Sequence, residues 1–385
     1  MSFCWSTSSL MVFALLPMFL SEVLQASKTK IGLIEGVAYF TAFVFKIFSG
    51  VFSDYVKKRK SLIAAGSFGT IVVKLMFAAA STISWVFVAR FIDRLCMGIR
   101  AAPTDALVAD ISPPQELGRS YGLRYSLYTM GAVFGSGIAA ACMWFSSNNY
   151  HFVFILSAIP ATIALLILLM VVKAPPIVNK AAHTRPTWHI RHVLVLPPAF
   201  WMLLFITSLL MMARFSEAFM TLRARELGWS IALLPMIIVI DHIVQAAVAY
   251  PVGKLADRTN RYDMLLKGML FLVLGNILMM AASSPGNIIF GVVVVGVHMG
   301  ATQGLLAALV ADATPADLRG TAFSLFYLVT GIAVLLANWL AGHLSDLYGV
   351  SGAFRGGLVF STLACFALWT MRGRDLKPQA EGSSL

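Results

Sequence analysis

Charged side chains lie inside several of the most apolar segments of this 385-residue chain. The densest group is in the stretch FVARFIDRLCMGIRAAPTDALVAD, where Arg90, Asp93, Arg94, Arg100 and Asp105 are surrounded by apolar residues. At about 100° per residue, all five fit within an arc of about 140° on one helix. A polar face of this kind, turned toward the interior of a helical bundle, is typical of a solute or ion pathway.

Two interpretations of this group are open. Arg90, Asp93 and Arg94 stand at i, i+3 and i+4, so they can neutralise one another on the helix surface. Alternatively, Arg94 and Arg100 face the path of a solute. Pro103 follows in the same segment and is expected to kink it.

Other apolar segments carry charge as well. Lys74 lies deep in its segment, Arg214 and Glu217 can pair locally at i, i+3, and Asp241 precedes His242 directly. Adjacent carboxyl and imidazole groups in a low dielectric can exchange protons near neutral pH. We therefore expect Asp241, His242 and Asp93 to couple protons to transport.

The deep cations outnumber the deep anions, which favours an anionic solute such as a carboxylate, a phosphate ester or a polyacid. The expected substrate-binding residues are Arg94, Arg100, Arg90, Lys74 and Arg214. For two further residues we expect ordinary structural roles. His298 should be a packing residue whose hydrogen bonds are satisfied, and Glu35 should lie near the end of its segment, where it touches water.

The composition shows what positions these residues. Apolar residues make up 59% of the chain, charged residues 12%, and the mean hydropathy is +0.83, which is typical of a membrane protein. The formal charge of +12 gathers in connecting loops, so it does not indicate nucleic-acid binding. Polar and Gly/Pro clusters divide the chain into twelve apolar segments, each long enough for a tilted transmembrane helix. Their expected limits are 3–24, 31–54, 60–81, 83–110, 119–145, 150–173, 197–222, 230–256, 262–283, 286–312, 319–347 and 352–372.

Lys and Arg residues concentrate in the loops after even-numbered segments, which places those loops and both termini in the cytoplasm. The basic stretch 174–196 separates an N-terminal lobe, 1–173, from a C-terminal lobe, 197–373, and a tail, 374–385, follows. Each lobe is expected to hold six helices.

Two motifs recur between the halves. GVFSDYVKKRK begins at Gly50 and GKLADRTNR begins 203 positions later, at Gly253. ALVAD ends at Asp110 and again 202 positions later, at Asp312. Nearly equal offsets indicate two homologous halves related by a pseudo-twofold axis along the membrane normal. The same shift maps the five charged residues of 90–105 onto uncharged ones, so these charges are specific to the first half.

The second loop motif resembles the glycine–aspartate–basic loop of the major facilitator superfamily of secondary transporters. Its matching residues are Gly253, Leu255, Asp257, Arg258 and Arg261, whereas the first copy keeps Gly50, Asp54, Lys58 and Arg59. Arg94, Gly98, Ala101 and Ala102 partly match a further helix-four pattern of the family. The resemblance implies an all-α fold of twelve transmembrane helices in two six-helix lobes. It also implies that Asp54 and Asp257 latch the cytoplasmic side, with Asp110 and Asp312 in the shared machinery. Asn260 suits a left-handed turn in the second loop.

These features predict a proton-coupled secondary transporter of a small, anionic organic solute, working by alternating access. It is expected in a bacterial cytoplasmic membrane as a monomer in the lipid bilayer, with no cofactor, no metal site and no enzymatic activity. Symport and antiport both stay open, and proton-driven efflux of drugs or siderophore-like compounds is a close alternative. A non-transporting solute receptor or a membrane-embedded transferase is an alternative of another class. The sequence has no G-x-x-x-x-G-K-[ST] motif for a built-in ATPase.

Overall fold

The computed structural model describes residues 1–56, 59–112, 117–172, 195–256, 259–315 and 318–371. Their regular structure is helical, and no strand occurs among them. The first half holds α1 (Ser2–Phe13), α2 (Leu16–Met18), the π-helix η1 (Phe19–Val23), α3 (Lys28–Val56), α4 (Arg59–Ala78), α5 (Ile83–Ile111), α6 (Leu117–Phe145), α7 (Tyr150–Leu156) and α8 (Ala158–Met170). The second half holds α10 (Pro198–Met212), α11 (Ala218–Glu226), the 3-10 turn η3 (Ile231–Leu233), α12 (Pro235–Ala256), α13 (Arg261–Ala281), α14 (Asn287–Asp312), α15 (Arg319–Tyr348) and α16 (Ser351–Met371).

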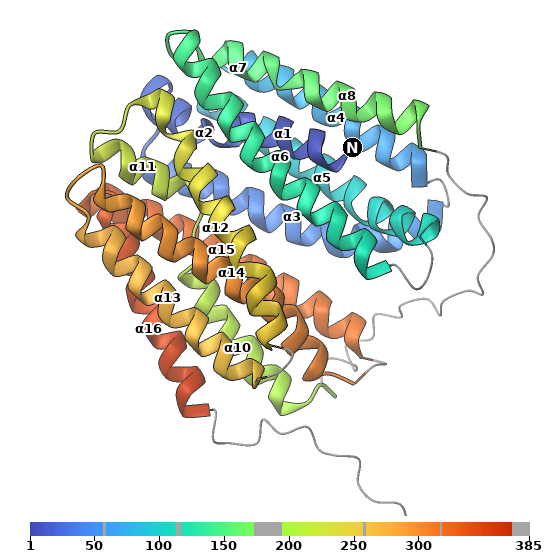
Figure 1. Ribbon diagram of the computed structural model, residues 1–385, viewed down its shortest axis with the longest axis vertical. Helices are drawn as coiled ribbons and strands as arrows, with labels where there is room; N and C mark the ends of the chain where they lie inside the picture. Colours follow the sequence, from blue (N-terminus) through green and yellow to red (C-terminus); the bar gives the residue numbers. More distant parts are fainter. Residues whose placement is uncertain (57–58, 113–116, 173–194, 257–258, 316–317, 372–385) are drawn as a thin grey trace, which may run out of the picture.

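The helices form two bundles that lie side by side, one from each half of the sequence (Figure 1). Each of the twelve predicted segments overlaps a helix or an interrupted helix. Within the described residues, nine helices are long and apolar enough to cross a membrane. The other three segments correspond to α3, α5 and the shorter α10 with α11. The chain is thus a multi-pass integral membrane protein.

The segments that open the two halves are both interrupted. In the first, α1 ends at Phe13 and Pro17 lies at the start of α2, because proline cannot donate the amide hydrogen bond that a continuous helix needs. In the second, α10 and α11 are separated by residues 213–217. Breaks at matching positions of two repeats often mark the binding site of a transporter.

Polar residues begin several of the other helices. The side chains of Thr82, Asn149 and Asn260 accept backbone hydrogen bonds at the starts of α5, α7 and α13. Asn260 has φ −67°, so the expectation of a left-handed turn residue there is wrong. Its side chain satisfies a free amide of the helix start instead.

The two lobes meet closely where α3 lies against α15 (Figure 1). A Cβ atom added at Gly32 would collide with the carbonyl oxygen of Asn338, and one at Gly342 would collide with that of Lys28. Gly36 is similarly close to Leu335. Hydrogen in place of a side chain therefore allows these two helix backbones to approach.

Polar contacts between the lobes close the end at which α3 begins, which we call the outer end after the predicted topology. Asp346 of α15 accepts hydrogen bonds from the amides of Lys28 and Thr29, both at 2.9 Å. A carboxylate from one lobe thereby caps a helix of the other, where the helix dipole favours negative charge. Lys28 also pairs with Glu226 at 3.3 Å, and Arg225 donates to Glu22 at 2.7 Å. We call these contacts the outer clasp.

Glu226 is the most heavily shared acceptor of the outer clasp. Partial burial raises the pKa of this carboxyl, but hydrogen bonds from the Val350 amide and from Arg223, together with Lys28, outweigh burial and hold the pKa below its usual range. Its ionised form is therefore favoured by the closed arrangement.

Replacing Gly32 with alanine should separate α3 from α15, because the new methyl group would overlap the carbonyl oxygen of Asn338. Overpacking of this kind costs about 1–3 kcal/mol, so we expect a lower melting temperature and a wider outer end. Spin-label distances across the outer end would measure the opening. Gly137→Ala is the matched control, since a Cβ there meets no atom within 4 Å. Equal behaviour of the two variants would contradict the prediction.

Acid should weaken the outer clasp. A depressed pKa means that Glu226 stabilises closure above the ordinary glutamate value of 4.5 and loses this contribution as the pH falls through its own, lower pKa. The same spin-label distances, measured from pH 7 to pH values below 4.5, should show progressive opening. Glu226→Gln should be partly open already at pH 7 and should open less than the parent when the pH is lowered further. Identical titrations of the variant and the parent would contradict this role.

Candidate functional site

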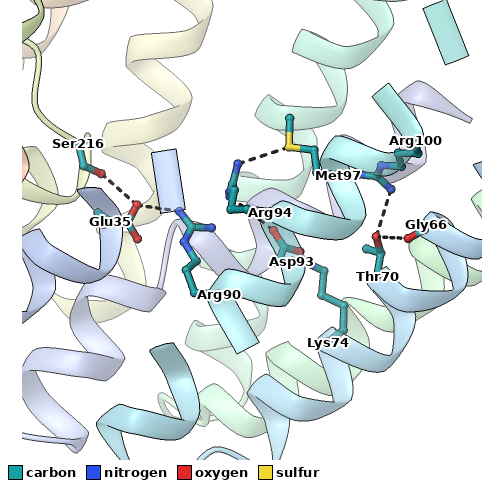
Figure 2. A network of polar contacts seen from close by, with 10 residues as sticks. All are labelled: Glu35, Gly66, Thr70, Lys74, Arg90, Asp93, Arg94, Met97, Arg100 and Ser216. Atoms are coloured by element: carbon teal, nitrogen blue, oxygen red, sulfur yellow. Dashed lines mark hydrogen bonds and ion pairs between the residues drawn. The ribbon is translucent and has the colours of Figure 1, made fainter. Parts of the chain in front are cut away.

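A buried ionic network surrounds α5 in the N-terminal lobe (Figure 2). Arg90 donates to Glu35 of α3 at 2.7 Å, and Lys74 of α4 pairs with Asp93 at 3.5 Å. Each of these four side chains is at most 5% exposed. Glu35 does not touch water as expected, because it lies between the lobes, where its carboxylate also accepts from Ser216 at 3.4 Å.

Aromatic rings in the first segment cover the network. The Phe13 ring lies 4.7 Å from Nζ of Lys74, 3.8 Å from Cζ of Arg90 and 4.6 Å from Cζ of Arg94. The guanidinium of Arg100 lies 4.6 Å from the Trp5 ring. Cation–π contacts of this kind stabilise charge that has been withdrawn from water.

The network has more cations than carboxylates. Its described members are the cations Lys74, Arg90, Arg94 and Arg100 and the carboxylates Glu35 and Asp93. Arg94 has the weakest partners, namely the sulfur of Met97 at 3.4 Å and a carboxylate oxygen of Asp93 at 3.7 Å. Arg100 donates to the hydroxyl of Thr70 at 3.3 Å. The predicted local neutralisation therefore occurs between Asp93 and Arg94 only, whereas Arg90 uses a carboxylate from another helix.

A cavity of about 460 Å³ lies beside this network, mainly in the C-terminal lobe. Residues 213–217 line it together with parts of α10, α12, α13, α14, α15 and α16, and Tyr39 and Phe43 of α3 complete it. Its walls are largely apolar and aromatic, and its charged lining residues are Arg214, Glu217 and Asp241. The volume and the few polar groups are typical of a small-molecule site.

Arg214 lies in the break between α10 and α11, where it binds neutral partners. Its Nε donates to Nε2 of His298 at 2.9 Å, and its Nη2 donates to the hydroxyl of Thr302. Because Arg only donates, His298 must accept at Nε2 and donate from Nδ1 to the carbonyl of Gly268, 2.7 Å away. The predicted pair between Arg214 and Glu217 is wrong, since the helix is unwound between them, whereas the satisfied packing role of His298 is confirmed.

Asp241 of α12 is fully buried and incompletely satisfied. Its Oδ2 accepts from Nε2 of Gln245 at 2.5 Å, and its Oδ1 has no donor among the described residues. Nδ1 of His242 lies 3.9 Å from Asp241 and 3.0 Å from the carbonyl of Ile238. One carboxylate or imidazole atom from each of Glu217, Asp241 and His242 lies within 4.8 Å of the others. These separations exceed a direct hydrogen bond, so proton exchange within the group would need a bridging water molecule.

A second cavity of about 430 Å³ leads toward the end that carries the loop motifs. It lies between α6 and the pair α12–α14, and Met299 and Gln303 line both cavities. Gln245, the partner of Asp241, and Gly253 and Arg261 of the second loop motif also line it. Arg261 pairs with Asp312 at 2.5 Å, which joins the two repeated motifs within one lobe.

The structure thus divides the predicted site residues into groups. Of the predicted substrate-binding cations, Arg214 lines the central cavity, whereas Arg90, Arg94, Arg100 and Lys74 belong to the neighbouring network. Arg59 begins α4. The side chains of Asp54 and Asp110, the surroundings of Gly50, and the whole of Asp257 and Arg258 lie outside the described residues. The sequence reasoning missed the bridging role of Glu35 and the aromatic cover of Phe13. The available signal for Glu35 was that this carboxylate lies in a segment close to a segment rich in cations.

Comparisons with known proteins agree with this architecture. A family model described as the Major Facilitator Superfamily matches residues 1–240 and 218–384. The chain is 26% identical to an uncharacterized MFS-type transporter of Methanocaldococcus jannaschii, over 93% of this chain and 92% of that one. It is 26% identical to the quinolone resistance protein NorA of Staphylococcus aureus, over only 33% and 32% of the two chains. The crystal structure of a mutant of the nucleoside transporter NupG superposes with a TM-score of 0.81 at 14% identity, over 96% and 97% of the chains.

Removing Arg90 should destabilise the protein more than removing an exposed arginine. Arg90→Met leaves the Glu35 carboxylate buried without its ion-pair partner, which typically costs about 3–5 kcal/mol. Thermal unfolding in detergent measures the loss, and Arg355→Met on exposed surface is the control. Adding Glu35→Gln to Arg90→Met should recover part of the stability, because the unpaired charge is then removed. A double variant no more stable than the single one would contradict this pairing.

Proposed function

Because the chain belongs to the major facilitator superfamily and is a membrane transporter, we propose that it is a secondary active transporter of a small organic solute with an anionic group. The two lobes expose the central cavity alternately to the two sides of the membrane, and the movement of the solute is coupled to the movement of protons. The position of Arg214 is the observation that supports an anionic solute. This guanidinium lines the cavity and has only neutral partners among the described residues.

A guanidinium inside a membrane bundle is costly unless a negative charge compensates it. His298 and Thr302 satisfy two of the donors of Arg214 without supplying that charge. A carboxylate or phosphate of the solute would supply it, in the bidentate geometry that arginine favours.

The network around α5 supports the same solute class. Its surplus of cations generates a positive potential next to the cavity, and Ser216 of the cavity lining donates to Glu35 of the network. Arg94, whose donors have the weakest partners, is the member best able to turn toward an anion. We propose that three other cations contribute to the same positive potential, namely Arg90, Arg100 and Lys74.

Proton coupling is assigned to Asp241 and His242, with Asp93 as a second carrier in the other lobe. Asp241 has a buried oxygen without a donor in the described part of the chain, so its ionised form is costly while the cavity is dry and is stabilised when water enters. Opening and closing the cavity would therefore change its proton occupancy. Asp93 differs from Asp241 in that it lies between two cations, Lys74 and Arg94.

Alternating access is supported by the different contacts at the two ends. The outer clasp closes one end, and the second cavity extends toward the other, where the loop motifs lie. In the proposed orientation this second end and both termini are cytoplasmic, with Gly50, Asp54, Asp257, Arg258 and Asp110 in the cytoplasmic gate. The proposed setting is a bacterial cytoplasmic membrane, in which the chain acts as a monomer.

Proton-driven efflux is the alternative direction for the same machinery. The similarity to the quinolone resistance protein covers only 33% of this chain, and it makes drug-like solutes candidates for such efflux. The direction of solute movement under an imposed proton gradient distinguishes uptake from efflux. A receptor that does not transport would bind solute without any flux, and a transferase would release a modified product.

The test is solute-dependent proton flux in proteoliposomes that contain the full-length chain. Organic anions should produce flux, and lipophilic cations should not. Arg214→Ala, Arg94→Ala and Asp241→Asn should each reduce the flux by about tenfold or more, the scale expected for losing a hydrogen bond to a charged group. Arg355→Ala, on exposed surface, is the charge-matched control.

Three outcomes would contradict the proposal. Flux with lipophilic cations alone would contradict the anionic solute. Unchanged flux in Arg94→Ala and Asp241→Asn would contradict the roles of these residues. Binding without flux for every solute tested would indicate a receptor.

A further inference from the structure

The central cavity contains charges of both signs that do not neutralise each other. Arg214 has no described carboxylate within the 4 Å of an ion pair, although Glu217 is three residues away in the sequence. In a continuous helix, residues at i and i+3 would lie on one face and could pair. The unwound segment 213–217 prevents this.

Specific hydrogen bonds hold that segment unwound. The amide of Ser216 donates to Oδ1 of Asn338 on α15 at 2.8 Å, and the amide of Ala218 donates to the Ser216 hydroxyl at 3.2 Å. Backbone groups released from a helix inside a membrane need such partners. The separation of Arg214 from Glu217 is therefore built into the fold.

The acidic side of the cavity has unused acceptors. The Glu217 side chain lines the cavity and has neither a hydrogen bond nor an ion pair with the described residues. Asp241 lines the same cavity, is fully buried, and has no donor to Oδ1 within that part of the chain. The proton on Nδ1 of His242 is directed to the carbonyl of Ile238. Both carboxylates can thus receive a cation from the cavity.

We propose that the cavity binds a zwitterionic solute, whose cationic group meets Glu217 with Asp241 and whose anionic group meets Arg214. This inference rests on the proposed function, because it keeps Arg214 as the site of the anionic group, and it adds Glu217 as a specificity-determining residue. A solute with both charges compensates both sides of the cavity at once, whereas a simple anion brings no cationic group to Glu217 and Asp241. Phe215, Phe326 and Tyr327 in the lining provide apolar contact for the body of the solute between its charged groups.

Matched probes test this inference directly. The full-length protein in detergent is titrated with 3-phenylpropionate, 3-phenylpropylamine and phenylalanine, which share a phenyl body and carry the anion, the cation or both. Naphthyl and indolyl versions of each triplet extend the series to larger bodies. Affinity is read from the ligand-dependent rise in melting temperature. We expect the zwitterion of at least one triplet to bind about tenfold more tightly than its anion, which corresponds to ~1.4 kcal/mol.

Two variants separate the roles of the cavity charges. Glu217→Gln should abolish the preference for the zwitterion, whereas the anion should still bind, at least as tightly as before, because a negative charge has been removed from the cavity. Retained anion binding also reports a folded protein. Arg214→Gln should lose binding of both the anion and the zwitterion.

The outcomes distinguish this inference from the proposed function. Equal binding of anion and zwitterion by the parent protein, or a zwitterion preference that survives in Glu217→Gln, overturns the inference and leaves the anion site intact. Binding of the amines alone, or of no probe in any triplet, overturns both.

Discussion

The cost of placing charge inside a hydrocarbon layer is the constraint on which this structure depends. A buried ion must find an opposite charge, an aromatic face or a strong hydrogen-bond partner, or it destabilises the fold. In the N-terminal lobe, the charges of α5 meet Glu35 on α3 and Lys74 on α4, and the Phe13 ring covers three cations. Three helices and the interrupted first segment are therefore fixed relative to one another by electrostatics as well as by packing.

The C-terminal lobe meets the same constraint in another way. In this lobe, the positions that correspond to the α5 charges hold uncharged residues. The deep cation, Arg214, comes instead from the break between α10 and α11 in the seventh segment. Arg214 reaches Thr302 on α14, the position that corresponds to Arg100 in the repeat. Both lobes thus place a guanidinium against a threonine hydroxyl, Arg100 with Thr70 and Arg214 with Thr302, but from different helices. The two halves share a scaffold and differ in how it is charged.

The sequence was sufficient to predict the helical fold, because long apolar segments and motifs at nearly constant offset are local or repetitive signals. It also identified Arg214 and Asp241 as deep charges. It did not predict the partners of these charges, since partner choice depends on helix rotation and on where a helix breaks. Nothing in the residues around Arg214 marks an unwound segment, because the hydrogen bond that stabilises it comes from Asn338, over a hundred positions away. Glu35 was misplaced for a related reason: its depth depends on the contact between the lobes.

The short helix α11 links the cavity to the outer clasp. Arg214, Ser216 and Glu217 precede its first residue, and Arg225 and Glu226 stand at its other end, nine residues along. Arg225 and Glu226 bind Glu22 and Lys28 of the opposite lobe, while Ser216 contacts Glu35 in the buried network. A rigid helix transmits a displacement of one end to the other, so a solute that displaces Glu217, which directly precedes α11, is expected to displace the clasp residues as well. Any solute that binds these two residues more tightly in one arrangement of the lobes must shift the clasp toward that arrangement. We infer that the break at 213–217 permits this coupling, because α10 and α11 are not one continuous helix.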